Sequence, residues 1–184
     1  MPRWKILKST ELFKARIFTL RSDECELPDG RVMPSYYVMD FPDWVNVIAV
    51  TNDKKMILVE QYRHAGDKVF LEVPGGTLDS RTEDPRMAGE RELLEETGYR
   101  AGEVIDLGPH YPNPALQSNR MHSYLALDCK RVAEQDLDPF EDLQVKVIPI
   151  SEAFAKWENG EFQHSIIAAS LGRAWKLLRE RGLL

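Results

Sequence analysis

Three carboxylate residues stand near the middle of the chain at a spacing that could place them on one side of a helix. Glu95 and Glu96 follow Glu92 by three and four positions, and residues at those separations are neighbours on a helix surface. Like charges this close repel one another unless a cation lies among them. Such oxygen ligands suit Mg²⁺ or Mn²⁺, which also bind substrate phosphates. The alternative is a solvated acidic face, although Arg91 is the only basic residue in the range 88–98.

The residues around this cluster indicate where the helix begins and ends. Asp84-Pro85 is typical of an N-cap followed by the first helical residue, and Gly98 is typical of the residue that ends a helix. Before them, Pro74-Gly75-Gly76 should end a strand and let the backbone approach another group. Glu72, just ahead of that turn, is a further candidate to face the cation. We therefore expect a strand, a turn and a helix in succession.

The stretch Arg91–Tyr99, RELLEETGY, resembles the core of the Nudix box, R-E-U-x-E-E-x-G-U, in which U is a bulky apolar residue. Glu83 precedes Arg91 by eight positions, as in that pattern, whereas the loop from Gly76 to Glu83 is one residue longer. The motif is long and specific. The resemblance implies hydrolysis of a nucleoside diphosphate linked to another group. It also implies ligands for Mg²⁺ or Mn²⁺, which would be the carbonyl of Gly75 and the carboxylates of Glu92, Glu95 and Glu96.

A second resemblance is to the ADP-ribose and nucleoside-diphosphate-sugar pyrophosphatases within the Nudix family. Gln61-Tyr62-Arg63 is similar to a Q-Y-R motif ahead of the box in that group, and Pro114 stands 16 residues after Gly98, a distance typical of it. Around this proline the group has S-P-G-x-x-x-E, where this chain has Asn113-Pro114-Ala115 and Asn119. These replacements weaken the resemblance to enzymes specific for ADP-ribose.

Arg63, Tyr36 and Pro114 are the residues that we expect to bind the substrate. The guanidinium of Arg63 is planar and permanently charged, which suits a diphosphate. The alternative for this residue is a surface ion pair. Tyr36, like Trp4 and Tyr37, is a candidate to stack on the nucleotide base, but an aromatic residue in a strand also serves packing.

We assign catalytic roles to Glu141, Glu95 and Arg91. In the enzymes that the chain resembles, a glutamate in the loop corresponding to residues 133–141 acts as general base or orients the attacking water. Glu141 is the best positional match, and Glu134, Asp136 and Asp138 are alternatives, as is a solvated carboxylate without a role. Arg91 stands four positions before Glu95 and could hold it by a contact along the helix.

The composition restricts the classes of partner. The chain has 184 residues and a net charge of −6, whereas proteins that bind nucleic-acid polymers usually present a basic face. No apolar run approaches membrane-spanning length, and the N-terminal segment lacks the apolar part of a signal peptide. Cys25 and Cys129 have no metal-ligand spacing and suit free thiols in a reducing cytoplasm, or packing residues. We expect a cytoplasmic protein that binds neither membranes nor nucleic-acid polymers.

The elements expected around the box indicate an α+β fold. Residues 1–43 contain short strand patterns at 3–7, 15–26 and 32–39, with a turn at Pro28-Asp29-Gly30. Further strands are expected at 44–50, 56–60, 69–73, 100–107, 121–127 and 142–147, and helices at 151–158, capped by Ser151, and 164–181. The resemblance implies a Nudix α/β/α sandwich with a mixed sheet at 44–184, preceded by an N-terminal antiparallel β subdomain at 1–43 that forms a homodimer and contributes to the nucleotide pocket.

These residues predict Mg²⁺-dependent hydrolysis of the pyrophosphate bond of ADP-ribose or another nucleoside diphosphate sugar, which gives a nucleoside monophosphate and a sugar phosphate. One alternative is a Nudix enzyme that acts on dinucleoside polyphosphates or nucleoside triphosphates. Another is a non-enzymatic ligand sensor, although such proteins lose box carboxylates that are present here. The preferred base and sugar do not follow from the sequence.

Overall fold

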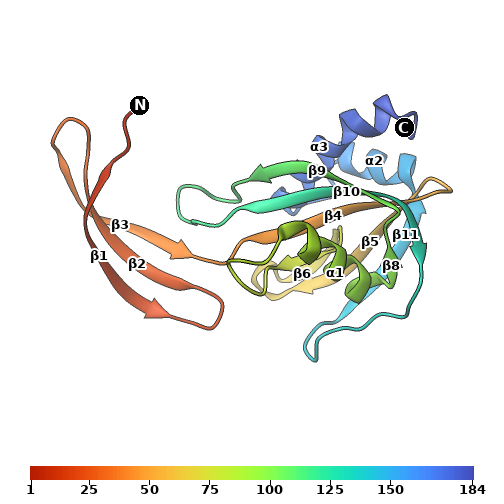
Figure 1. Cartoon of the computed structure of the whole chain (residues 1–184), viewed down its shortest axis with the longest axis horizontal. Helices are drawn as coiled ribbons and strands as arrows, with labels where there is room; N and C mark the ends of the chain where they lie inside the picture. Colours follow the sequence, from red (N-terminus) through yellow and green to blue (C-terminus); the bar gives the residue numbers. More distant parts are fainter.

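The computed structural model describes residues 1–184 and contains two separate β-sheets, of three and eight strands. The smaller sheet consists of β1 (Lys5–Lys14), β2 (Thr19–Glu26) and β3 (Val32–Asp40), paired antiparallel in that order. It extends to one side of the rest of the molecule (Figure 1). Gly30 has φ +86° in the β2–β3 turn, so the predicted hairpin is confirmed.

The larger sheet is mixed. Its central pair, β4 (Trp44–Thr51) and β10 (Met121–Arg131), runs parallel, whereas the other pairs are antiparallel. The main order is β11-β5-β4-β10-β8, with β6 on β5, β7 on β4 and β9 on β10. The remaining bounds are β5 (Lys55–Arg63), β6 (Lys68–Glu72), β7 (Gly75–Thr77), β8 (Tyr99–Arg100), β9 (Glu103–His110) and β11 (Leu143–Pro149); a short 3₁₀ turn, His64–Gly66, joins β5 to β6.

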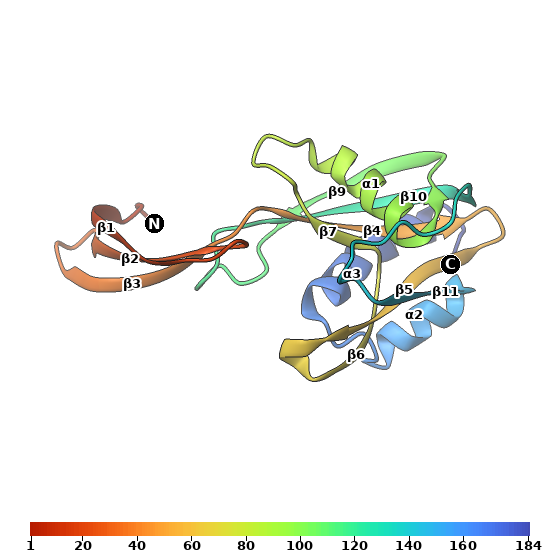
Figure 2. The same cartoon turned by 90° about the horizontal axis from the view of Figure 1, so that it is seen from below.

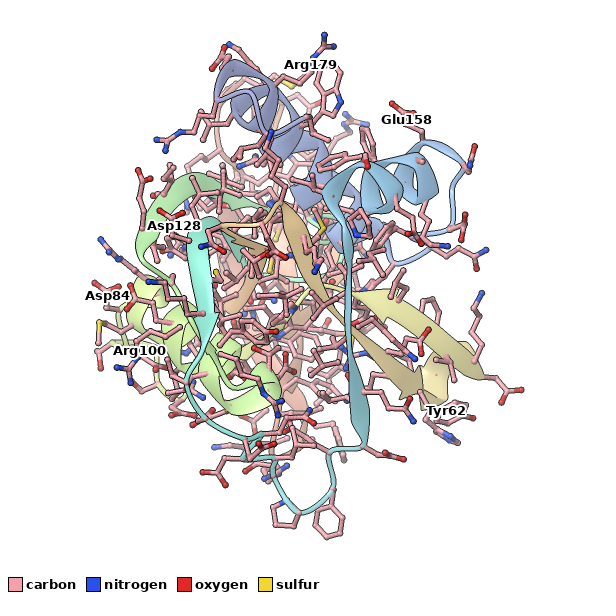
Figure 3. The ribbon with its side chains drawn as sticks, turned by 90° about the vertical axis from the view of Figure 1, so that its right-hand side faces the viewer. Tyr62, Asp84, Arg100, Asp128, Glu158 and Arg179 are labelled. Atoms are coloured by element: carbon pink, nitrogen blue, oxygen red, sulfur yellow. The ribbon has the colours of Figure 1, made fainter.

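Three helices cover the two faces of this sheet. Helix α1 (Pro85–Thr97) lies on one face, and α2 (Ile150–Glu158) and α3 (Ser165–Glu180) lie on the other (Figure 2). In the side-chain view, the labelled Asp84 and Arg100 beside α1 lie across the molecule from Glu158 of α2 (Figure 3). The predicted α+β arrangement, with a mixed sheet between helices and a small antiparallel sheet before it, is therefore confirmed.

Alternation along the central strands builds a core on each face. On β4, Val45, Val47 and Ala49 pack with residues of α1, while Ile48 and Val50 pack with residues of α2 and α3. Successive side chains of a strand point to opposite faces, so an almost continuous apolar run fills both cores. This sheet buried on both faces is the rigid frame for the loops at its edge.

Four local predictions in these elements need correction. The strand expected at 15–26 begins only at Thr19, because a turn closed by the Ala15 N–H and the Phe18 carbonyl precedes it. Strand β1 is longer than the predicted 3–7, because it pairs with β2 along its whole length to the Lys14–Thr19 pair. The single strand expected at 100–107 is two strands, β8 and β9. Ser151 does not cap its helix: α2 begins at Ile150 directly after Pro149, without a side-chain cap.

None of the three helices combines the length and the hydropathy needed to span a membrane.

Candidate functional site

Helix α1 carries the predicted acidic cluster, and its packing decides how far each carboxylate is buried. Asp84 accepts hydrogen bonds from the backbone N–H groups of the first turn, and Gly98 ends the helix with φ +75°. Leu93 holds the helix against the sheet as part of the core. Beside it, Glu92 and Glu96 are only 8% and 4% exposed. Two of the three predicted carboxylates therefore lie inside the protein, whereas the side chain of Glu95 is 39% exposed.

The start of strand β7 brings the backbone against these carboxylates. Gly75 and Gly76 pair here with Asn46 and Val45 of β4 and do not form the turn expected from the sequence. The N–H of Gly75 donates to Oε2 of Glu96 over 2.9 Å. At Gly76 a Cβ atom would lie within 2.8 Å of both carboxylate oxygens of Glu92, so glycine leaves the space that this carboxylate occupies. The structure thus places Gly75, Glu92 and Glu96 together, as the sequence predicted, although their role as metal ligands stays a prediction.

Both buried carboxyl groups hold protons more tightly than an ordinary glutamate. Burial raises the pKa of Glu92 to about 7 and that of Glu96 to about 8. Arg91 opposes the shift at Glu92, and the Gly75 N–H opposes it at Glu96, while Glu141 raises the pKa of both. A divalent cation would relieve this concentration of negative charge. No three acidic, histidine or cysteine groups already converge on one point, yet the buried oxygen donors fit a hard cation.

Arg91 connects the helix to the loop before it. Its Nη1 lies 3.0 Å from Oε1 of Glu92 and 3.0 Å from Oε2 of Glu95, so the contact with Glu95 expected from the sequence is present. Its Nη2 lies 3.5 Å from Glu83, whose other oxygen accepts from the backbone N–H of Asp79 over 2.6 Å. The longer loop therefore still delivers Glu83 to the arginine of the box.

An open cavity of about 850 Å³ lies over α1 and the start of β7, and the acidic loop before β11 forms part of its wall. Glu141, Asp136 and Asp138 line the cavity, whereas Glu134 pairs with Arg131 over 2.5 Å and is 88% exposed at its side chain. The position of Glu141 near Glu92 and Glu96 suits a residue that activates or orients the attacking water. Which of these acids is the general base stays a prediction.

Two backbone contacts fasten this loop to the end of α1. The side-chain amide of Gln135 donates to the carbonyl of Glu96 over 2.7 Å, and the N–H of Asp136 donates to the carbonyl of Glu95 over 2.9 Å. These contacts join residues about forty positions apart, so no local pattern reveals them.

Arg63 lines the same cavity but is not free. Its Nε and Nη2 donate to the two oxygens of Glu72 over 3.2 and 2.5 Å. Nδ1 of His164, at the start of α3, lies 2.8 Å from Oε1 of the same carboxylate. Glu72 is therefore held by two basic residues, and its hydrogen bonds and ion pairs join it to Arg63 and His164 and not to α1. Sequence reasoning missed His164 as a member of the cavity wall, because only the fold brings it to β6.

Tyr36 and Pro114 lie outside this cavity. The hydroxyl of Tyr36 donates to the carbonyl of Ala115 over 2.8 Å, in the exposed loop that contains Pro114. The ring of Tyr36 also makes an edge contact with Trp4 at 6.1 Å between centroids. Their predicted contact with the substrate is therefore not made by the cavity that one chain forms by itself, and it stays a prediction.

Two family descriptions divide the chain near the boundary between its sheets. The description "NUDIX domain" matches residues 41–169, and "Nucleoside diphosphate sugar hydrolase N-terminal domain" matches residues 4–39. The first of these matches covers more than half of the chain.

Individual relatives agree with these family matches. A protein of Bacillus methanolicus described as methanol dehydrogenase activator is 37% identical over 142 residues, or 76% of each chain. The ADP-ribose pyrophosphatase of Bacillus subtilis (strain 168) is 29% identical over 158 residues, which are 85% of this chain and 84% of that protein. A crystal structure described as an ADP compounds hydrolase has a TM-score of 0.86 and covers 100% of this chain and 98% of that one. At 22% identity that last match shows the shared fold alone.

Proposed function

The chain belongs to the NUDIX family, and on this premise we propose that it hydrolyses the pyrophosphate bond of ADP-ribose or a related nucleoside diphosphate sugar. The products would be a nucleoside monophosphate and a sugar phosphate. The family match of the N-terminal residues and the similarity to an ADP-ribose pyrophosphatase support this substrate class.

One observation carries the proposal: a single cavity is lined both by buried carboxylates and by an arginine. Glu92 and Glu96 lie on the α1 side, and Arg63 lies on the β5 side. A diphosphate needs positive charge along its length. Arg63 supplies it at the β5 side. On the α1 side Arg91, which also lines the cavity, is already bonded to Glu92 and Glu95, so further positive charge there requires a bound cation.

We propose Mg²⁺ as that cation, with Mn²⁺ as a substitute, held by Glu92, Glu95, Glu96 and the carbonyl of Gly75. When bound, the cation neutralises phosphate charge and acts as a Lewis acid. Arg91 would orient Glu92 and Glu95 through the contacts that it already makes.

Glu141 is the proposed general base and would take a proton from the attacking water, since a carboxylate in this loop lies at the cavity wall. Arg63 would neutralise charge on the phosphate that leaves. The planar guanidinium binds phosphoryl oxygens through paired N–H groups.

We further propose that the N-terminal sheet forms a homodimer and that the partner completes the substrate pocket. Strand β1 is exposed along its whole length, and its apolar side chains include Ile6 and Phe13, which are 57% and 56% exposed. Exposed apolar surface of this kind commonly marks a protein interface. In such a dimer the sheet carrying Tyr36 could contribute to a cavity of the other subunit. Sedimentation equilibrium on the whole chain would test the dimer.

The proposed cytoplasmic location is supported by Cys25 and Cys129, which are both free and buried. Structural disulfides are rare in reducing compartments.

A product analysis tests the proposed reaction. Purified protein with Mg²⁺ would be offered ADP-ribose, other nucleotide sugars, nucleoside triphosphates and dinucleoside polyphosphates, and the products would be identified by mass. We expect a nucleoside monophosphate and a sugar phosphate from the first two groups. Release of pyrophosphate from triphosphates, with nucleotide sugars left intact, would instead assign the chain to another Nudix activity.

A further inference from the structure

The residues that hold Glu72 form a charged group on the part of the cavity wall that β5, β6 and the start of α3 supply. Glu72 is almost fully buried, at 1% exposed, and its two oxygens accept three hydrogen bonds from Arg63 and His164. Burial alone would raise the pKa of Glu72, but the bonds from His164 and Arg63 hold it below the ordinary value. The carboxylate is therefore an anion, and an anion only accepts hydrogen bonds.

The anionic carboxylate of Glu72 determines which ring nitrogen of His164 carries a proton. Because Glu72 accepts, Nδ1 of His164 carries a proton, and the other ring nitrogen, Nε2, is left without a partner in the protein. The side chain of His164 is 34% exposed and lines the cavity. A carboxylate that orients a histidine by its Nδ1 is a common way to present Nε2 to a ligand.

The same carboxylate determines which edge of Arg63 is available. Nε and Nη2 are directed at Glu72, whereas no protein group accepts from Nη1. Arg63 and His164 thus each have one edge held by Glu72 and one nitrogen available at the cavity. When His164 is protonated, the single negative charge of Glu72 does not balance the charges of Arg63 and His164, so the three side chains together are positively charged.

The backbone at the start of α3 adds positive partial charge to that of Arg63 and His164. His164 is the residue before α3, and the helix begins without a side-chain cap. Ile166 and Ile167 of its first turn also line the cavity. The N–H of Ile167 donates to the carbonyl of His164 over 3.0 Å, whereas those of Ser165 and Ile166 have no partner within the helix, and the helix dipole is positive at this end. This part of the cavity wall therefore favours an anion, and the part that α1 supplies favours a cation.

We propose that His164 and Arg63, held on the shared carboxylate of Glu72, form a phosphate-binding pair that takes the phosphoryl oxygens lying away from the α1 carboxylates. Nε2 of His164, protonated, donates to one oxygen, and Nη1 of Arg63 donates to another. Glu72 is then a positioning residue for both and not a metal ligand. This inference rests on the proposed function for the identity of the natural ligand, but the pair itself requires only a diphosphate.

Two substitutions at His164 separate its two nitrogens. The amide nitrogen of asparagine occupies the place of Nδ1, and that of glutamine occupies the place of Nε2. His164→Asn thus keeps the bond to Glu72 and loses the donor in the cavity, whereas His164→Gln keeps that donor. The exposed His64 of the β5–β6 connection lies outside the cavity, so His64→Asn is a matched control.

The probe is inorganic pyrophosphate with Mg²⁺, whose dissociation constant would be measured by calorimetry. Loss of one hydrogen bond to a charged group should weaken binding about tenfold to a hundredfold in His164→Asn. His164→Gln should lie between His164→Asn and the unaltered protein, because it keeps the donor in the cavity but neither the charge nor the bond to Glu72, and His64→Asn should remain within about threefold of the unaltered protein. Unchanged binding in His164→Asn would overturn the proposal.

Nuclear magnetic resonance of the unaltered protein gives a second test that does not depend on the folding of a variant. The chain has four histidines, so the ring nitrogens can be assigned individually. Saturation with pyrophosphate at neutral pH should move the Nε2 signal of His164 towards the protonated form while Nδ1 stays protonated. A His164 signal that does not respond at saturation would contradict the proposal.

The same variants, assayed with ADP-ribose, distinguish failure of the pair from failure of the proposed function. If ADP-ribose is cleaved and His164→Asn binds pyrophosphate normally, the pair is wrong and the function stands. If ADP-ribose is not cleaved but pyrophosphate binding depends on Nε2 as described, the pair stands and the substrate assignment is wrong.

Discussion

Adding one methyl group at Gly76 should disable the cation site and leave the fold intact. A Cβ atom there would lie 2.5 Å from Oε1, 2.6 Å from Cδ and 2.8 Å from Oε2 of Glu92. Favourable contacts between such atoms begin near 3.5 Å, so the carboxylate must retreat by about 1 Å. Metal–oxygen distances in a working site vary by only about 0.2 Å. Gly76→Ala should therefore remove Glu92 as a ligand.

The expected loss follows from that displacement. Disturbing the support of a metal ligand typically costs about 10- to 100-fold in metal affinity or activity, and a displaced ligand should cost at least as much. The assay is the Mg²⁺ concentration that gives half-maximal hydrolysis of ADP-ribose. The thermal unfolding midpoint of Gly76→Ala should stay close to that of the unaltered protein, because the obstructing atoms are the end of a flexible side chain.

Two other glycines provide the comparison. At Gly75 a Cβ atom would meet the backbone carbonyl oxygen of Val45 at 2.2 Å, so Gly75→Ala should destabilise the fold, by about 1–3 kcal/mol or more. Gly172 in α3 has its nearest neighbour at 3.4 Å, and Gly172→Ala should be tolerated. If Gly76→Ala retained normal Mg²⁺ dependence, the placement of Glu92 at the cation would be refuted.

Further predictions concern pH, the box arginine and the buried polar contacts. Since burial raises the pKa of Glu92 to about 7 and that of Glu96 to about 8, a cation must displace protons below those values. Apparent Mg²⁺ affinity, measured by calorimetry, should be constant above pH 8, fall about tenfold towards pH 7 and fall up to about a hundredfold per unit below it. Arg91→Ala should lower kcat/KM for ADP-ribose about 10- to 100-fold, with Arg91→Lys intermediate because it keeps the charge but not the fork. Ser170→Ala should lower the free energy of unfolding in urea by about 1–3 kcal/mol, because Nδ2 of Asn46, 2.8 Å from the Ser170 hydroxyl, would lose its partner inside the core.

The acidic helix was predictable from the sequence because its signals are local. The cap at Asp84 and the stop at Gly98 are determined by residues one turn away, and the spacing of Glu92 and Glu96 alone places both on one helix face. The contact between Arg91 and Glu95 also lies within one turn.

The other wall of the cavity was not predictable, because its contacts are long-range. His164 and Glu72 are 92 positions apart, and nothing near either residue indicates the other. From the sequence alone, a surface ion pair was the alternative to substrate binding for Arg63. The structure shows an ion pair with a buried carboxylate at the edge of the cavity, which is compatible with a substrate contact. The cap expected at Ser151 failed because β11 continues to Pro149, and the helix begins immediately after it.

The most direct test of the account is to locate the cation. Crystals soaked with Mn²⁺ and a non-hydrolysable ADP-ribose analogue should show an anomalous difference peak within ligand distance of Glu92 and Glu96, and Glu96→Gln should lose both the peak and most turnover while it remains folded. No peak beside these side chains in crystals of a protein that hydrolyses ADP-ribose, or full turnover in Glu96→Gln, would contradict the central claim.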